Sequence, residues 1–149
     1  MDSIRAQDAL FCDRLEWDVS VSPRMNTSLI QSNVISADVA ARYKFSEHFA
    51  IGLDVAPTVF DFSDDLIVFA PVSVSMRYVV TDSLPLSPYI LLNVGGSFLQ
   101  IEPDPELQAR VAVGASYSVG GRCALFGEVG VVCSNIGILW TPLSCGIRF

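Results

Sequence analysis

The 149-residue sequence has one histidine and four cysteines, none of them in a CxxC pair, and these scarcities exclude several kinds of site. Because His48 is the single imidazole and Cys12, Cys123, Cys133 and Cys145 lack metal-ligand spacing, a zinc site is not expected. A disulfide, for example between Cys12 and Cys145, would need an oxidising compartment. We favour the alternative that each cysteine acts as a small apolar residue. The sequence therefore predicts neither a metal nor a cofactor.

Basic residues are also scarce. Nine Lys and Arg stand against sixteen Asp and Glu, so the net charge is -7, and the basic residues form no cluster. Phosphate contacts need clustered basic side chains, so nucleic acid is not an expected partner. The chain as given also lacks a charged segment followed by an apolar run, and we expect that a signal peptide has been removed from it.

Long apolar runs are the third absence. Half of the residues are hydrophobic (51%), yet no run approaches the ~18 residues of a membrane helix. The apolar residues instead alternate with polar ones, which is the period of a β-strand. The alternating segments cover residues 14–22, 33–45, 49–60, 67–80, 88–100, 107–119, 122–134 and 137–149. Eight such strands joined as hairpins predict one antiparallel up-and-down barrel domain over residues 14–149, after a loose N-terminal segment, 1–13.

The two faces of these strands differ sharply. One face is apolar and carries no charge, and the other holds five acidic and five basic residues: Glu16, Asp18, Asp38, Arg42, Lys44, Asp54, Arg77, Arg110, Glu128 and Arg148. A soluble, lipocalin-like barrel would turn its charges to water, where the two signs need not match. Inside a narrow lumen an unpaired charge is costly. The balance therefore favours a transmembrane barrel with its apolar face toward lipid, and a network of ion pairs inside.

Aromatic residues give an independent test of this orientation. If neighbouring strands run in opposite directions, seven aromatic residues of the apolar face gather at one end of the barrel: Trp17, Tyr43, Phe45, Phe49, Tyr78, Tyr117 and Phe149. Amphipathic rings settle at a membrane interface, and a soluble fold supplies no reason to collect them at one level. We call these seven residues the girdle, and we expect the lipid bilayer to be a partner of the chain.

The chain ends on WTPLSCGIRF, in which a final aromatic follows apolar residues two, four and six positions earlier. This ending resembles the assembly signal of bacterial outer-membrane barrels. The stretches ARYKFSEHFAIGLDVAP and SMRYVVTDSLPLSPYILLNVGGSF are also similar to hairpins of the outer membrane protein W, X and opacity-type groups. The resemblance covers most of residues 14–149. It implies a bacterial outer-membrane location, both termini on the periplasmic side, and insertion by the assembly machinery through the C-terminal strand.

Catalysis is not expected. Small outer-membrane enzymes of this size use serine and histidine near the outer rim, whereas His48 lies in a turn predicted for the opposite end from Ser36 and Ser97. A single misplaced histidine cannot complete a triad. The sequence therefore predicts a protein that is not an enzyme.

One inward-facing set is apolar and lies toward the upper end: Phe60, Phe69, Leu99, Val132, Ile138 and Trp140. It resembles the hydrophobic pocket of the outer membrane protein W group and implies an upper chamber for a small hydrophobic ligand, which would leave sideways because charges fill the lumen below. In the alternative, the strands project beyond the membrane and these residues pack under the loops. Two functions follow from the pair of interpretations: binding or admission of small hydrophobic molecules, or a structural anchor that contacts host or envelope components.

Overall fold

The structure, a computed structural model, describes residues 13–26, 33–62, 65–81, 83–97, 106–135 and 137–149. The expected loose segment lies almost wholly outside this part of the chain. No helix in the described ranges is both long and apolar enough to cross a membrane.

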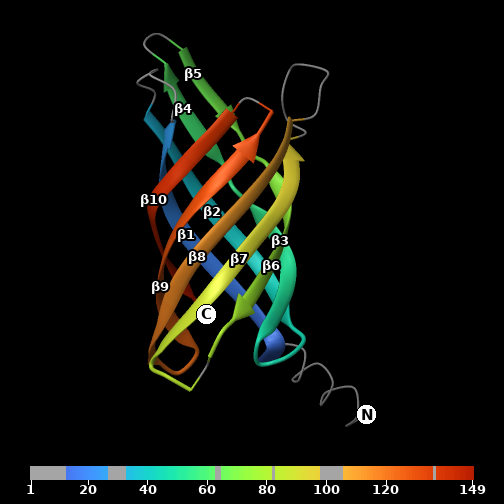
Figure 1. The fold of residues 1–149 in the computed structure, drawn as a ribbon, viewed down its shortest axis with the longest axis vertical. Coiled ribbons are helices and arrows are strands. Elements are labelled where there is room, and N and C mark those ends of the chain that lie inside the picture. Colours follow the sequence, from blue (N-terminus) through green and yellow to red (C-terminus); the bar gives the residue numbers. More distant parts are fainter. Residues whose placement is uncertain (1–12, 27–32, 63–64, 82, 98–105, 136) are drawn as a thin grey trace.

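Ten strands make up the fold. They are β1 (Leu15–Asn26), β2 (Asn33–Lys44), β3 (Phe49–Val55), β4 (Thr58–Phe62), β5 (Asp65–Phe69), β6 (Val72–Val79), β7 (Leu86–Ser97), β8 (Glu106–Gly120), β9 (Cys123–Ser134) and β10 (Gly137–Arg148). All neighbours pair antiparallel, and β1 pairs with both β10 and β2, which closes the sheet. The ring β1–β2–β3–β6–β7–β8–β9–β10 has eight members, so the predicted eight-stranded barrel is confirmed (Figure 1).

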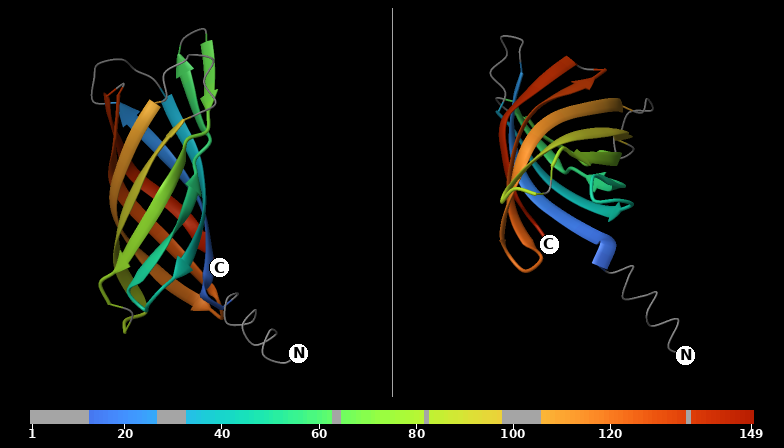
Figure 2. Two further views of the ribbon diagram at one scale, coloured as in Figure 1. Left: turned by 90° about the vertical axis from the view of Figure 1, so that its right-hand side faces the viewer. Right: turned by 60° about the horizontal axis from the view of Figure 1, so that its bottom comes forward.

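The strands β4 and β5 form a hairpin above this ring. β4 pairs with the upper part of β2 and with β5, and the hairpin reaches the top of the molecule (Figures 1 and 2). The predicted strands 49–60 and 67–80 are therefore each divided in two. Proline has no N–H for the ladder, and the two breaks contain Pro57 and Pro71. The breaks lie side by side, since Ala56 N donates to Pro71 O at 3.1 Å.

The turns at the lower end are tight. Gly120 and Gly121, in the turn between β8 and β9, have φ of 138° and 59°, which glycine adopts without the strain that a Cβ would cause. Between β2 and β3, Phe45 N donates to Phe49 O at 3.0 Å, and the hydroxyl of Ser46 accepts from the backbone of Phe49 at 3.1 Å. Short turns of this kind hold successive strands in register.

Side-chain burial is the reverse of that in a soluble protein. Among the described residues, the buried side chains are mostly serine, arginine and acidic residues, while the large exposed ones are mostly valine, leucine, isoleucine and aromatic residues. Water-soluble folds bury the second kind and expose the first. The apolar exterior and polar interior of the ring are the faces of a transmembrane barrel.

A β-bulge in β10 changes which residues face outward. The pairing of β10 with β9 shifts between Thr141 and Ser144, on either side of Pro142, and the pairing of β1 with β10 shifts between Val21 and Met25. An extra residue in one strand exchanges inside and outside beyond it. The side chains of the last strand therefore face the predicted side below the bulge and the opposite side above it.

β1 also continues beyond the predicted end at residue 22. It runs through Pro23, which points outward, to Asn26, and it pairs with β2 as far as Arg24. Arg24 was placed in a polar link by the sequence, but its side chain is buried in the lumen.

Candidate functional site in the barrel lumen

The lower half of the lumen holds one set of ion pairs, the lower group: Glu16, Asp18, Arg42, Lys44, Arg77 and Arg148. Asp18 is at its centre. Arg148 Nε donates to Asp18 Oδ1 at 2.7 Å and Nη2 donates to Oδ2 at 3.0 Å, and Arg42 donates to the same carboxylate. A two-point arginine–carboxylate contact of this kind is the strongest ion-pair geometry in proteins.

Glu16 forms ion pairs with the two remaining cations of the lower group, Arg77 and Lys44. It accepts from Arg77 Nη2, and Lys44 Nζ lies 3.1 Å from Glu16 Oε1. These residues come from β1, β2, β6 and β10, so the pairs cross the lumen and join strands that are not all neighbours.

A second set, the upper group, occupies the middle and upper lumen: Arg24, Asp38, Asp54, Arg110 and Glu128. Arg110 joins two strands, with Nη2 3.1 Å from Glu128 Oε2 and Nη1 3.3 Å from Asp38 Oδ2. Arg110 and Glu128 are therefore a buried ion pair of the kind that the balanced charges predicted. Arg24 Nη2 lies 3.4 Å from Asp38 Oδ1, a contact that the sequence reasoning missed.

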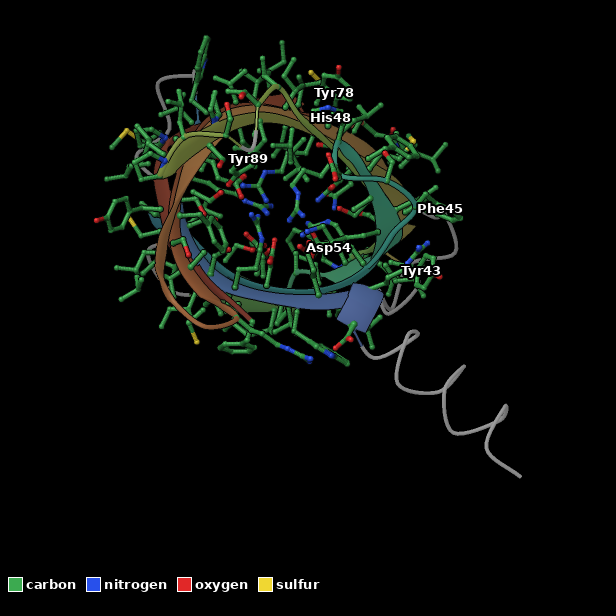
Figure 3. The ribbon with its side chains drawn as sticks, turned by 90° about the horizontal axis from the view of Figure 1, so that it is seen from below. Tyr43, Phe45, His48, Asp54, Tyr78 and Tyr89 are labelled. Carbon is green, nitrogen blue, oxygen red and sulfur yellow. The ribbon has the colours of Figure 1, made fainter. Side chains whose placement is uncertain are left out.

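Neutral side chains connect the lower group with Asp54. Arg42 Nε donates to Ser75 Oγ at 2.7 Å, Ser75 Oγ donates to Asn93 Oδ1 at 2.7 Å, and Asn93 Nδ2 donates to Asp54. Asp54 points into the ring in a view along the barrel (Figure 3). The ten predicted lumen charges are thus gathered in the lumen, where hydrogen bonds connect them across it.

Two inward aromatic residues were not singled out from the sequence. Tyr89 donates to Glu128 Oε1 at 3.2 Å, and the guanidinium of Arg148 lies 5.2 Å from the ring centres of both Tyr89 and Phe126. Tyr89 fits because β8 has glycine opposite it, where a Cβ on Gly114 would lie 2.8 Å from the ring. The alternation of the strand could have identified Tyr89 as inward-facing, because the next residue, Ile90, lies on the outer face.

Two cavities lined by described residues differ greatly in size. The void of about 10 Å³ between the two groups has room for about one water molecule. The larger cavity, the lower vestibule, has a volume of about 650 Å³ and opens at the lower end. Its lining includes Glu16, Lys44, Arg77 and Arg148. The described lumen is therefore filled in its middle and hollow below.

The predicted upper chamber is only partly assembled. Phe69 and Val132 are buried inside the barrel and pack with Val34 and Leu139. Ile138 and Trp140 were predicted to face inward, and this is wrong: they are 48% and 52% exposed on the outer surface. Leu139, which lies between them in the sequence, is buried.

The bulge around Pro142 explains these reversals, because it inverts the alternation in the upper part of β10. Leu99 lies outside the described residues, and so does the side chain of Phe60.

The girdle residues all lie on the outer surface, half-buried or exposed. Figure 3 shows Tyr43, Phe45 and Tyr78 outside the ring and Tyr89 inside it. Trp140 belongs to this outer surface near the other end. It stands nine residues from Phe149, which is about 30 Å along a strand. At a tilt of about 40° this is about 23 Å across the membrane, close to the ~25 Å apolar band of such barrels.

The side chains considered for catalysis or metal binding do not come together. His48 lies in the lower turn between β2 and β3, outside the ring, with Nδ1 3.0 Å from Val79 O, whereas Ser36 is in the upper part of β2 and hydrogen-bonds to Asp38. In the part of the chain that the structure covers, no three His, Cys, Asp or Glu residues are arranged to hold a metal ion.

Comparison with known proteins supports the fold. No protein-family model and no curated protein sequence matches the chain. A transmembrane β-barrel from a study of de novo design is similar, with a TM-score of 0.57, 20% identity, and coverage of 91% of this chain and 92% of the other. The outer membrane protein Ail of Yersinia pestis, in a phospholipid bilayer nanodisc, has a TM-score of 0.53, 19% identity, and coverage of 90% and 99%. The chain has the fold of a small outer-membrane β-barrel.

Proposed function

We propose that the protein is a bacterial outer-membrane barrel that stays closed and serves as a rigid anchor, acting through its ends instead of through its lumen. The observation that supports this most directly is that two sets of buried ion pairs, together with the hydrogen bonds from Arg42 to Asp54, fill the lumen. A passing solute would have to break several buried charged contacts at once, each of them costly. The protein is not an enzyme in this proposal, and it inserts through the assembly machinery by its last strand.

Single-channel recording tests the closed lumen. The refolded barrel is first checked for strand-type circular dichroism and for heat-modifiable migration in detergent, and is then added to planar bilayers. We expect no stable conductance steps. A matched control is the double variant Arg42→Ser, Arg77→Ser, which removes two large side chains from the lower group. Stable large channels from the unmodified barrel would reject the proposal, and a barrel that remains monomeric and soluble without detergent would favour the lipocalin-like alternative.

A second candidate function is the binding of a small hydrophobic molecule at the upper end of the lumen. The packed apolar cluster of Val34, Phe69, Val132 and Leu139 favours it, because a structural anchor with a polar lumen has no need of an apolar layer there. Such a ligand would insert between these side chains from above and leave sideways.

Saturation-transfer NMR with decanoate and with small aromatic molecules tests this candidate on the refolded barrel. Binding should weaken at least tenfold in Val132→Phe, which fills the space, and stay unchanged in the outward control Val131→Phe, one position along the same strand. If none of the apolar compounds shows saturable transfer, this second function is rejected and the anchor remains the proposed function.

A further inference from the structure

The charges inside the barrel do not balance at each level. The lower group contains four cations, Arg42, Lys44, Arg77 and Arg148, and two anions, Glu16 and Asp18, so its net charge is 4 - 2 = +2. The upper group contains Arg24 and Arg110 with the carboxylates of Asp38, Asp54 and Glu128. Every ion pair between described lumen residues falls within one group or the other.

Arg77 has hydrogen-bonding capacity left over. Its side chain is 2% exposed, and Nη2 donates to Glu16, but Nε and Nη1 have no hydrogen-bond partner among the described residues. Nη1 lies 3.6 Å from Asp18 Oδ2, which is beyond hydrogen-bond distance. The Tyr89 ring, 6.0 Å away, supplies no acceptor. Buried donors without an acceptor are uncommon and unfavourable, so this guanidinium indicates a missing anionic partner.

The lower vestibule places open space beside the side chain of Arg77; its Nε and Nη1 atoms are themselves covered, so the side chain turns toward the cavity when it meets an anion. Arg77, Arg148 and Lys44 line it, and its volume of about 650 Å³ is ample for a tetrahedral anion. Ser87, Ser116 and Ser118 line it as well. Of the three acidic residues in its lining, Glu16 already accepts from two cations, Asp13 is paired with Arg122, and Glu47 is exposed in the lower turn between β2 and β3.

We propose that the lower vestibule binds a phosphate group, held by Arg77 and Lys44 at the positively charged floor of the cavity. A phosphate carries between one and two negative charges near neutral pH, which matches the excess of +2, and its oxygens suit the two unused donors of an arginine fork. The girdle residues Trp17 and Phe149 also line the vestibule. The cavity therefore reaches the membrane interface, so that the group can come from a free phosphate or from a lipid headgroup.

Equilibrium dialysis measures this binding directly. The refolded full-length barrel in an uncharged maltoside detergent is dialysed against radiolabelled inorganic phosphate at constant ionic strength, with chloride as the competing anion. We expect saturable binding of one phosphate per barrel. Absence of saturable binding, or binding that chloride displaces at equal concentration, would overturn the proposal.

Matched variants then locate the site. Arg77→Gln, which can still donate to Glu16, should bind phosphate about tenfold more weakly, the usual effect of losing one charge-assisted hydrogen bond. Lys44→Gln changes a side chain that is already 34% exposed, so it should fold normally and also bind more weakly. Arg110→Gln removes an equally buried arginine of the upper group and should bind as the unmodified barrel does. Equal loss in Arg110→Gln, or unchanged binding in Lys44→Gln, would overturn the assignment to the vestibule.

The source of the phosphate is distinguished by competition. Dihexanoyl phosphatidate and glycerol phosphate are each used to displace the labelled phosphate from the unmodified barrel, with dihexanoylglycerol as the uncharged control. Displacement at lower concentration by dihexanoyl phosphatidate assigns the site to a lipid headgroup, and equal displacement by the two assigns it to a free phosphate compound. Displacement by dihexanoylglycerol would show that apolar contacts and not the anion are recognised, which contradicts the proposal.

Discussion

The lower and upper halves of the barrel differ in regularity. In the lower half, β2 pairs with β3 and β3 with β6 without a break, and two-residue alternation places every side chain on its expected face. In the upper half, proline breaks divide two strands, and Pro142 lies within a bulge. The comparison teaches that alternation assigns a side chain to a face only as far as the strand continues without an extra residue.

The two halves also differ in the sign of their excess charge. The lower group has more cations than anions and lies beside a large cavity, whereas the upper group has more anions and surrounds a void for about one water. The net charge of the two groups together is 2 - 1 = +1, so the upper group offsets half of the excess of the lower group. The predictions below disturb one half and use the other as the control.

The largest expected effect is in the lower group. Asp18→Asn removes the carboxylate that Arg42 and Arg148 share and leaves both guanidinium groups without it. Breaking a buried ion pair from one side costs about 3–5 kcal/mol of unfolding free energy. Urea titration in detergent, followed by circular dichroism, measures it. The control is Asp13→Asn, at the exposed pair with Arg122, where no measurable change is expected. Equal effects at the two positions would contradict the buried network.

In the upper group the sharper test is a double-mutant cycle between Arg110 and Glu128. Each single variant, Arg110→Met or Glu128→Gln, leaves the other charge buried and should lower the unfolding free energy by about 3 kcal/mol. The double variant should lose clearly less than the sum, with a coupling of about 1–3 kcal/mol, because neither charge is then stranded. Losses that add within about 0.5 kcal/mol would show that the two residues do not interact.

Most of the barrel could be predicted from sequence because its two faces are chemically opposite. Ten of the eleven charged residues of the two groups follow from parity, and so does the girdle; Arg24 was missed because β1 continues beyond its predicted end. Bulges and proline breaks were not predictable in the same way, because an apolar pair such as Ile138 and Trp140 suits a lipid face as well as an inner pocket. The lower vestibule was also missed, since alternation assigns a face to a side chain but not the space left between side chains.

The bulge also makes a prediction about the two tryptophans, because it turns Trp140 from the predicted inward face to the outer surface, where Trp17 was already expected. Trp17 and Trp140 are both exposed on the outer surface, at opposite ends. In nanodiscs, lipids brominated near the headgroup should quench both single-tryptophan variants, Trp140→Phe and Trp17→Phe, more than lipids brominated near the chain ends, because each ring lies at an interface. Strong quenching of Trp17 with none of Trp140 would return Trp140 to the interior.

The smallest effect is expected at the seam between the first and last strands, where the backbone pairing of β1 and β10 is interrupted between Val21 and Met25. Ser22 and Ser144 lie there, fully buried, with their hydroxyl oxygens 2.8 Å apart. A hydroxyl has one proton, and Ser22 Oγ donates at 2.7 Å to Asp38 Oδ2, so Ser144 is the donor between the two serines.

This order of donation predicts unequal effects from two similar substitutions. Ser144→Ala removes one neutral hydrogen bond and should cost about 1 kcal/mol of unfolding free energy. Ser22→Ala removes the link to Asp38 as well and should cost about 2–3 kcal/mol, since bonds to charged groups contribute more. Ser73→Ala, a buried serine away from the seam, is the control. Urea titrations of the three variants under one set of conditions rank them, and a larger loss in Ser144→Ala than in Ser22→Ala would reverse the proposed direction of donation.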